Sequence, residues 1–383
     1  MKDQETEFSA AQPPSPLPWY TRPAARTWTC APPPPDARAF HTALPGYAPT
    51  ALHELPRLAR ELAVGRVFVK DESTRFGLPA FKALGASWAI DRILAHGANG
   101  PRGTTGTPIR RLVTATDGNH GRAVARTARQ LGRRAHVFVP DGVQPAAVAA
   151  IEGEGAEVTT VAGSYDAAVR EARAAAATPD AVLVQDMAWE GYEEIPALVV
   201  EGYATLFAEV DAQLDAAEAQ SPALVAVPVG VGSLAQAAVT HYRSGRGAQA
   251  SPAAAPPAVL SVEPVGAACV LASLRAGRLA RVPTDVTVMA GLNCGTPSAL
   301  AWPVLREGLD AAVAVTDADS TSAARDLAEL GVSSGPCGAA SLAGVRAALT
   351  GAGSTERRAA LGVHPDAIIV LINTEGADAN PGR

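Results

Sequence analysis

Short apolar segments that alternate with helical segments constrain the fold of this chain more than any other feature. Nine apolar segments are rich in β-branched residues and mostly lack the polar–apolar alternation of a half-exposed strand. They span residues 66–72, 111–117, 134–140, 157–162, 181–186, 223–230, 258–264, 311–317 and 367–376. Strands that are covered on both faces have this composition, and they are typical of parallel sheets.

Segments with a helical pattern separate the strand candidates. They include residues 121–132, 164–178, 233–245 and 320–331. This repeated alternation predicts an α/β fold of the doubly wound kind. Nine strands would strain one twisted sheet, so we expect two sheets in two domains. Residues 1–45 are rich in proline and predict an extension or strap with little regular structure.

Composition and charge exclude several classes of function. Hydrophobic residues make up 48% of the 383 residues and charged residues 18%, which permits a large buried core. The net charge of −6 argues against nucleic acid or an acidic membrane as the main partner. We find no apolar run of about 18 residues and no apolar signal-peptide core, and therefore expect a cytoplasmic protein without a membrane span. The four cysteines include no CxxC pair, so no metal site is expected.

A glycine-rich run between the strand at 223–230 and the next helical segment is a candidate anion site. It comprises Gly230, Val231, Gly232, Ser233 and Leu234. Glycines let backbone N–H groups approach an anion, and a helix N-terminus adds its dipole. Ser233 could both cap the helix and bind a phosphate. The run matches neither GxGxxG nor a Walker loop, so an ordinary tight turn is the alternative.

Polar residues follow three other strands at their C-terminal ends, where ligands gather in open α/β sheets. Asp117, Asn119 and His120 lie between two glycines; the amide of Asn119 can donate to an oxyanion, and Asp117 can accept a proton. Asp186 ends the strand at 181–186, and the hydroxyl of Thr374 could bind a ring nitrogen. The alternative for each is a polar turn or a helix cap.

Lys82 lies in the apolar part of the segment DESTRFGLPAFKALGASWAI (71–90), between Phe81 and Ala83. Desolvation lowers the pKa of a lysine from about 10.4 and makes its amine nucleophilic. A lysine of this kind that faces a phosphate site suits a covalent bond to pyridoxal phosphate (PLP). The alternative is a side chain that lies along an apolar surface with its ammonium in water.

Together these motifs resemble those of the fold type II PLP enzymes, the tryptophan synthase β family, and within it those of the diaminopropionate ammonia-lyases. The matching segments follow the family's order from about residue 45 to the end: 71–90, 114–125, 185–196, 201–210, 228–237, 261–269, 289–298 and 372–376. The resemblance implies a two-domain α/β fold in which each domain has a mainly parallel twisted sheet flanked by helices. It implies a large PLP-binding domain (46–110 and 190–383), a small mobile domain (111–189) and a homodimer.

The resemblance also implies roles for the site residues. Lys82 would hold PLP, Asn119 would bind the 3′-oxygen of PLP, and Thr374 would face its pyridine nitrogen. The phosphate would bind to Gly230, Val231, Gly232, Ser233 and Leu234. The amino-acid substrate would bind around Ser73, Asp117, His120 and Asp186.

The implied reaction is the α,β-elimination of D- or L-2,3-diaminopropionate to pyruvate and two ammonia by way of aminoacrylate. Asp117 matches the aspartate that takes the Cα proton of the D-substrate, and Lys82 would serve the L-substrate. Asp186 matches a second acid near the substrate amine. A carboxylate suits a cationic β-ammonium, which a hydroxy amino acid lacks.

Four residues depart from the family pattern near the expected cofactor and substrate walls. Pro79 replaces an asparagine, Thr296 replaces a glutamate, and Pro336 and Cys337 replace Glu-Ser. They leave open a related fold type II lyase, dehydratase or β-replacement enzyme that acts on another β-substituted alanine. A non-catalytic PLP-binding protein is a further alternative, which the presence of Lys82, Asp117 and Asp186 disfavours.

Cys269 and Cys294 belong to two matching segments that are expected near the site. They could form a disulfide or a close thiol pair, and in the cytoplasm two reduced thiols are the default.

Overall fold

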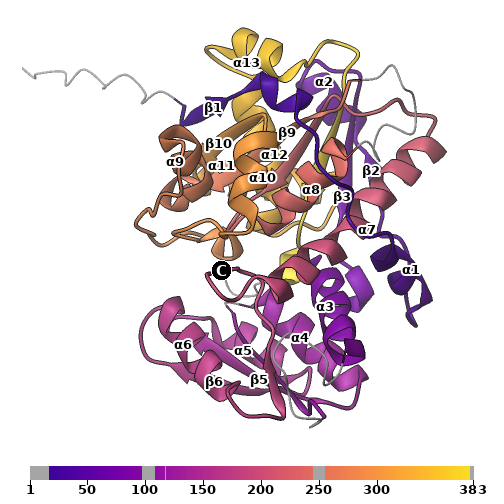
Figure 1. The fold of residues 1–383 in the computed structure, drawn as a ribbon. Coiled ribbons are helices and arrows are strands. Elements are labelled where there is room, and N and C mark those ends of the chain that lie inside the picture. The colour runs from indigo at the N-terminus through magenta and orange to yellow at the C-terminus, as the bar shows by residue number, and fades with distance from the viewer. Residues whose placement is uncertain (1–16, 97–107, 117, 245–254, 380–383) are drawn as a thin grey trace, which may run out of the picture.

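The computed structural model describes residues 17–96, 108–116, 118–244 and 255–379. In this part of the chain the strands form one sheet of seven strands and one of four. The larger sheet lies in the upper half of the molecule in Figure 1 and the smaller sheet in the lower half. The predicted α/β architecture with two mainly parallel sheets is confirmed.

The large sheet has the strand order β1-β10-β9-β8-β11-β3-β2. Its strands are β1 (Trp19–Thr21), β2 (Leu52–Glu54), β3 (Arg66–Asp71), β8 (Leu224–Pro228), β9 (Ala258–Pro264), β10 (Ala311–Val315) and β11 (Ile368–Asn373). The five inner strands run parallel, and the two edge strands pair antiparallel. Every residue of β8 to β11 is buried, as in a sheet that helices cover on both faces.

Two apolar cores lie on opposite faces of this sheet. One contains side chains of α7 (Glu194–Ala216), α8 (Ser233–Arg243), α9 (Cys269–Ala276) and α10 (Ala301–Gly308). The other contains side chains of α2 (Pro56–Glu61), α11 (Asp317–Glu329), α12 (Pro336–Leu349) and α13 (Ser354–Leu361). No helix among the described residues combines the length and the apolar character that crossing a bilayer requires.

The small sheet is parallel throughout and has the order β6-β5-β4-β7. Its strands are β4 (Arg111–Ala115), β5 (Arg134–Pro140), β6 (Glu157–Val161) and β7 (Ala181–Leu183). One apolar core joins this sheet to α3 (Lys82–His96), α4 (Asn119–Gln130) and α5 (Pro145–Glu152). A second core joins its other face to α6 (Tyr165–Ala175).

Two facing glycines fix the crossing of α3, which begins at Lys82, and α7. A Cβ on Gly85 would lie 2.6 Å from the ring of Tyr203, and a Cβ on Gly202 would lie 2.6 Å from the carbonyl oxygen of Leu84. Real Cβ atoms do not approach other atoms this closely, so any larger residue would push the two helices apart. The close crossing therefore sets where the first residue of α3 lies.

All nine predicted strands are present, each within three residues of its predicted end. The three-residue strands β1 and β2 were not predicted, because each is too short to show a periodic pattern. The predicted limits of the large and small domains, and the mobility of the small one, stay predictions. The alanine- and proline-rich sequence of residues 247–258 also predicts a surface loop, which lies mostly outside the described residues.

The proline-rich N-terminal segment contains more regular structure than predicted. Between residues 17 and 45, β1 pairs with β10 and α1 (Asp36–Ala43) packs against α7. Arg26 binds the buried carboxylate of Asp310 at 2.9 Å, and Arg243 binds the same carboxylate. The expectation of a strap over the body is met in this part, but the expectation of little regular structure is wrong there.

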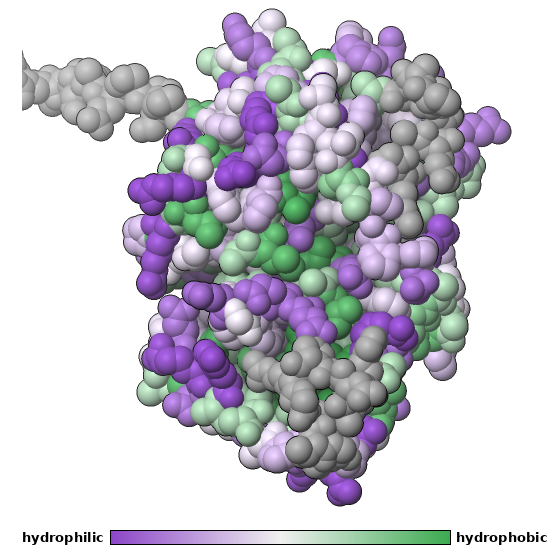
Figure 2. Space-filling view, viewed as in Figure 1, coloured by the Kyte–Doolittle hydropathy of each residue, from purple (hydrophilic) through white to green (hydrophobic). Residues whose placement is uncertain are grey.

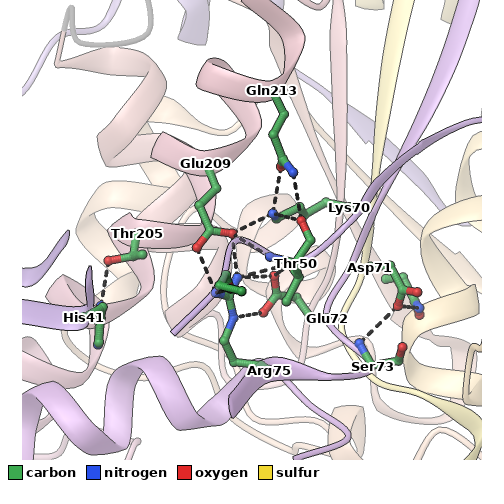
Figure 3. A network of polar contacts seen from close by, with 12 residues as sticks. His41, Thr50, Lys70, Asp71, Glu72, Ser73, Arg75, Thr205, Glu209 and Gln213 are labelled. Carbon is green, nitrogen blue, oxygen red and sulfur yellow. Dashed lines mark hydrogen bonds and ion pairs between the residues drawn. The ribbon is translucent and has the colours of Figure 1, made fainter. Parts of the chain in front are cut away.

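A buried ionic network ties α7 to the segment that leads into Lys82 (Figure 3). Glu209 of α7 accepts hydrogen bonds from Lys70 at 2.6 Å and from two nitrogens of Arg75 at 2.8 Å each. Arg75 also binds Glu72 at 2.7 and 2.8 Å. The side chains of these four residues are at most 1% exposed. Because buried charges are costly without partners, the network holds β3 and the following turn on α7.

The Glu209→Ala variant tests this network. It leaves the ammonium of Lys70 without a carboxylate partner inside the protein, and we expect the free energy of unfolding to fall by about 3–5 kcal/mol. Asp215→Ala on the exposed surface of α7 is the matched control and should change it by less than about 0.5 kcal/mol. Chemical denaturation measures both, and equal small effects of the two variants would contradict the proposed role.

Candidate active site

A cavity of 440 Å³ opens where the C-terminal ends of strands from both sheets meet. The segments after β4, β7, β8 and β11 all contribute to its wall, as expected for ligand sites in open parallel sheets. In the space-filling view, apolar residues gather in the band between the upper and lower halves of the molecule, beside more hydrophilic residues (Figure 2). Segments that follow strands of both sheets therefore form the wall of the cavity.

Lys82 is the first residue of α3 and lies in the cavity wall. The backbone before it is fastened to the end of β11, because Ala80 forms a bridge with Glu375 and the N–H of Phe81 donates to the carbonyl of Thr374 at 3.2 Å. The ammonium of Lys82 donates a hydrogen bond to a carboxylate oxygen of Asp186, in the segment after β7. One ion pair thus joins segments that follow strands of the two sheets.

The contact with Asp186 decides the pKa of Lys82. Burial is the largest single effect and lowers the pKa of this lysine, but the charge and hydrogen bond of Asp186, together with smaller effects of Tyr203 and Cys294, raise it above its ordinary value. Burial raises the pKa of Asp186, but the charge and hydrogen bond of Lys82, together with His120 and a backbone N–H, place it well below its usual range. The expectation that the pKa of Lys82 is lowered is therefore wrong. Asp186 is 104 positions away in the sequence, and no pattern near Lys82 announces it.

Asp186 is held in place by residues on both sides of the cavity. The side chain of Gln185 accepts a hydrogen bond from the N–H of Ala115 at 3.1 Å and donates one to its carbonyl at 3.0 Å, which fixes the segment against the end of β4. The hydroxyl of Ser233 donates to the backbone carbonyl of Asp186 at 2.9 Å. Both predicted residues, Asp186 and Ser233, therefore lie together in the cavity wall.

His120, near the start of α4, lines the cavity beside Asp186 and is 4% exposed. Its Nε2 is 2.9 Å from the carbonyl oxygen of Val184, and its Nδ1 is 3.9 Å from Oδ2 of Asp186. Burial and the charge of Lys82 lower the pKa of His120, while Asp186 acts in the opposite direction; burial is the largest effect, and the pKa is lowered overall.

The predicted glycine-rich run forms the turn between β8 and α8 and lines the cavity. Gly230 faces a crowded wall, since a Cβ there would lie 3.0 Å from the sulfur of Cys294 and from the carbonyl of Gly291. Gly232 has φ of +98°, in the left-handed region that favours glycine. Helix α8 begins at Ser233, with Gly232 at the N-cap position. The expectation that Ser233 is the N-cap is wrong, because its hydroxyl bonds to the carbonyl of Asp186 instead.

Asn119 and Thr374 also line the cavity, and a glutamate that was not predicted lies between their two segments. Glu375, which is 2% exposed, accepts a hydrogen bond from the amide of Asn119 at 2.6 Å and one from the N–H of Cys337 at 3.2 Å. The sequence held a sign of it, because Glu375 directly follows Thr374 at the end of a buried strand. Glu375 thereby joins α4, which packs on the small sheet, to the segment that follows β11 of the large sheet.

Three predicted site features remain to be placed. Asp117 lies outside the described residues. Ser73 is half-buried beside Gly376 and is not part of the cavity wall as the structure describes it, so the geometry lends no support to its predicted contact with substrate. Of the four departures from the family pattern, Thr296 and Cys337 line the cavity, whereas Pro79 and Pro336 are not part of the cavity wall as the structure describes it.

The thiols near the cavity are not joined by a disulfide. Cys294 lines the cavity, and the buried Cys269 lies with its sulfur 3.6 Å from the carbonyl oxygen of Gly230.

At its mouth the cavity is flanked by a pair of exposed charges. Asp166, at the start of α6, lies 3.5 Å from Arg281, and their side chains are 60% and 78% exposed. An exposed pair of this kind contributes little to stability.

Comparison with known proteins identifies close relatives of this chain. The family model described as pyridoxal-phosphate dependent enzyme matches residues 43–374. Diaminopropionate ammonia-lyase of Salmonella typhimurium is 38% identical over 74% of this chain and 72% of its own length. The enzyme of the same name from Escherichia coli K12 is 34% identical over 89% of this chain and 87% of its own length.

Solved structures agree with these relatives. A crystal structure of diaminopropionate ammonia lyase from Escherichia coli, in complex with an aminoacrylate-PLP azomethine reaction intermediate, matches with a TM-score of 0.80 at 32% identity and covers 95% of each chain. A threonine deaminase from Solanum lycopersicum matches with a TM-score of 0.69 at 21% identity, which shows a shared fold.

The Gly232→Ala variant tests whether the turn before α8 requires its glycine. A non-glycine residue at this φ is strained by about 1–2 kcal/mol, and the new Cβ would lie 2.7 Å from a methyl carbon of Leu305. Gly277→Ala is the matched control, since Gly277 has φ of +67° and open space around it. In denaturant unfolding we expect Gly232→Ala to lose at least about 1 kcal/mol more than Gly277→Ala. Equal losses would show that crowding at the turn is unimportant.

Proposed function

The chain belongs to the pyridoxal-phosphate dependent enzymes and, within them, to the diaminopropionate ammonia-lyases, and from this premise we propose that it converts 2,3-diaminopropionate to pyruvate and two molecules of ammonia. The observation that carries the proposal is the ion pair of Lys82 and Asp186 in a cavity that the glycine-rich turn also lines. The pair supplies an amine for the cofactor and a carboxylate for a cationic substrate in one place.

The residues of the cavity fit pyridoxal phosphate. The sequence contains three lysines, Lys2, Lys70 and Lys82. Lys70 is committed to Glu209 in the buried network, and Lys2 lies outside the described residues, whereas Lys82 lines the cavity. The turn from Gly230 to Leu234 ends in the first turn of α8, whose N–H groups have no partners within the helix and suit a phosphate.

We propose that three side chains of this cavity bind the cofactor. Lys82 would bond to the cofactor, Asn119 would donate to its 3′-oxygen, and Thr374 would face its ring nitrogen. When bound, the cofactor supplies an electron sink for the pair left at Cα after proton loss. The amide of Asn119 already donates to Glu375, and an amide nitrogen has two hydrogens, so that the second remains for the cofactor.

Asp186 is the residue to which we assign recognition of the β-amino group. Its carboxylate faces an ammonium, that of Lys82, and a β-ammonium of the substrate is the same kind of partner. A carboxylate here keeps the β-nitrogen protonated, and a protonated amine leaves as neutral ammonia. Serine or threonine would instead need a proton donor for a hydroxyl, which an ionised Asp186 does not provide.

We assign removal of the Cα proton to two different residues, because the L- and D-substrates present this proton on opposite faces. As a neutral amine, Lys82 would take the proton of the L-substrate. Asp117 would take that of the D-substrate, and this assignment rests on the family resemblance alone. The product 2-aminoacrylate hydrolyses to pyruvate, which accounts for the second ammonia.

We further propose that the enzyme is a cytoplasmic homodimer with a mobile small domain (111–189). These properties rest on the family resemblance.

The Asp186→Asn variant tests the proposed function most sharply. The amide removes the charge that binds the β-ammonium, and charge-assisted hydrogen bonds contribute enough that kcat/KM for diaminopropionate should fall about 100-fold. Pyruvate release from a panel of diaminopropionate, serine and other β-substituted alanines measures both rate and preference. The preference for diaminopropionate over serine should fall at least about 10-fold.

Asp166→Asn is the matched control, because Asp166 also lines the cavity but is exposed at its mouth. It should retain wild-type preference. A wild-type enzyme that acts best on a different β-substituted alanine would replace the proposed substrate, and an Asp186→Asn variant with wild-type preference would remove Asp186 from β-amine recognition.

A further inference from the structure

The imidazole of His120 has one nitrogen with a partner and one without. Nε2 is 2.9 Å from the carbonyl oxygen of Val184. A carbonyl oxygen only accepts hydrogen bonds, so Nε2 carries the hydrogen. Nδ1 is buried and has no hydrogen-bond partner in the described part of the chain. In the neutral ring, Nδ1 is therefore a bare lone pair.

This lone pair faces a second acceptor. Nδ1 lies 3.9 Å from Oδ2 of Asp186, the same oxygen to which Lys82 donates. Two acceptors that face each other in a buried place are unfavourable unless a proton lies between them. The ammonium of Lys82 makes the arrangement tolerable, because it donates a hydrogen bond to this oxygen of Asp186. Loss of that ammonium would leave Asp186 as a buried anion.

We propose that Asp186 and His120 form a proton-holding pair next to Lys82, in which His120 takes up the proton that Lys82 gives up. This inference rests on the proposed function, in which Lys82 must act as a neutral amine. In the first state the three groups are an ammonium, a carboxylate and a neutral imidazole. In the second they are a neutral amine, a carboxylate and an imidazolium whose Nδ1–H donates to Asp186.

The transfer balances in protons and in charge. One N–H bond breaks at Nζ of Lys82, and one forms at Nδ1 of His120. The three groups carry one positive and one negative charge before and after, so the buried site never holds an uncompensated charge. His120 acts through Asp186 and is thus a positioning residue. Asp186 stabilises the ammonium of Lys82, and His120 allows Lys82 to act as a base because it accepts the proton of that ammonium.

The groups that face His120 are few. In the described part of the chain they are Asp186 from the segment after β7, Lys82 from the start of α3 and the carbonyl of Val184 at the end of β7. Of these, only Asp186 favours the imidazolium by its charge and only Lys82 opposes it. Removing the charge of Lys82 should therefore make His120 bind a proton more tightly.

Histidine NMR on the full-length chain tests this directly. The chain has seven histidines, and selective isotope labelling with a His120→Gln variant identifies the signal of His120. We expect a neutral ring with hydrogen on Nε2 in the cofactor-free wild type at pH 7. In Lys82→Met the titration midpoint of His120 should rise by at least about one pH unit, a 10-fold tighter binding of the proton.

The double variant Lys82→Met with Asp186→Asn serves as the control, and there the rise should disappear. Comparison of wild type with and without bound PLP gives the same test without a substitution at Lys82, and the midpoint should again rise on loading. An unchanged midpoint in both Lys82→Met and the loaded wild type would overturn the proposal. Because these titrations need no turnover, they stand apart from the identity of the substrate.

Activity gives a second readout that a purely structural role would not move. His120→Gln keeps an N–H near Val184 but removes Nδ1, so Lys82 would lose its internal proton acceptor. The acid limb of the kcat/KM profile for the L-substrate should then shift to higher pH by at least about one unit. A uniform fall in activity with an unshifted profile would count against the proposed pair.

Discussion

The contact between Lys82 and Asp186 depends on the relative placement of two sheets. Lys82 starts a helix that follows a strand of the large sheet, and Asp186 follows a strand of the small one. Neither residue can reach the other unless the C-terminal edges of the sheets face each other. The crossing of α3 and α7 at Gly85 and Gly202, together with the buried network around Glu209, holds the lysine-bearing segment in position.

The same contact explains why the cavity suits both a cofactor and a diamino substrate. A partly buried carboxylate that is paired with an ammonium is costly to leave without a cation. When Lys82 is engaged elsewhere, Asp186 requires another positive group, and a β-ammonium or an imidazolium at His120 meets that requirement. Recognition of the substrate and control of the lysine proton would then depend on one carboxylate.

The sequence predicted the strands, the two sheets and several segments of the cavity wall, because each followed from the pattern of the residues. Asn119, Asp186 and the turn at 230–234 follow strand ends, where a periodic segment stops at polar or glycine residues, and Lys82 was predicted from its apolar neighbours. The raised pKa of Lys82 and the bridge from Asn119 to Glu375 arise from pairs of residues far apart in the chain. The strands β1 and β2 were not predicted, because a segment of three residues is too short to show a periodic pattern.

Reduction of the PLP-loaded enzyme with borohydride, followed by peptide mass mapping, tests the central assignment most directly. Reduction makes the bond between the cofactor and its lysine permanent, and with three lysines in the chain the outcome is easily read. We expect the added mass on the peptide that contains Lys82. The added mass on the peptide of Lys70 or Lys2, or on no lysine, would contradict it.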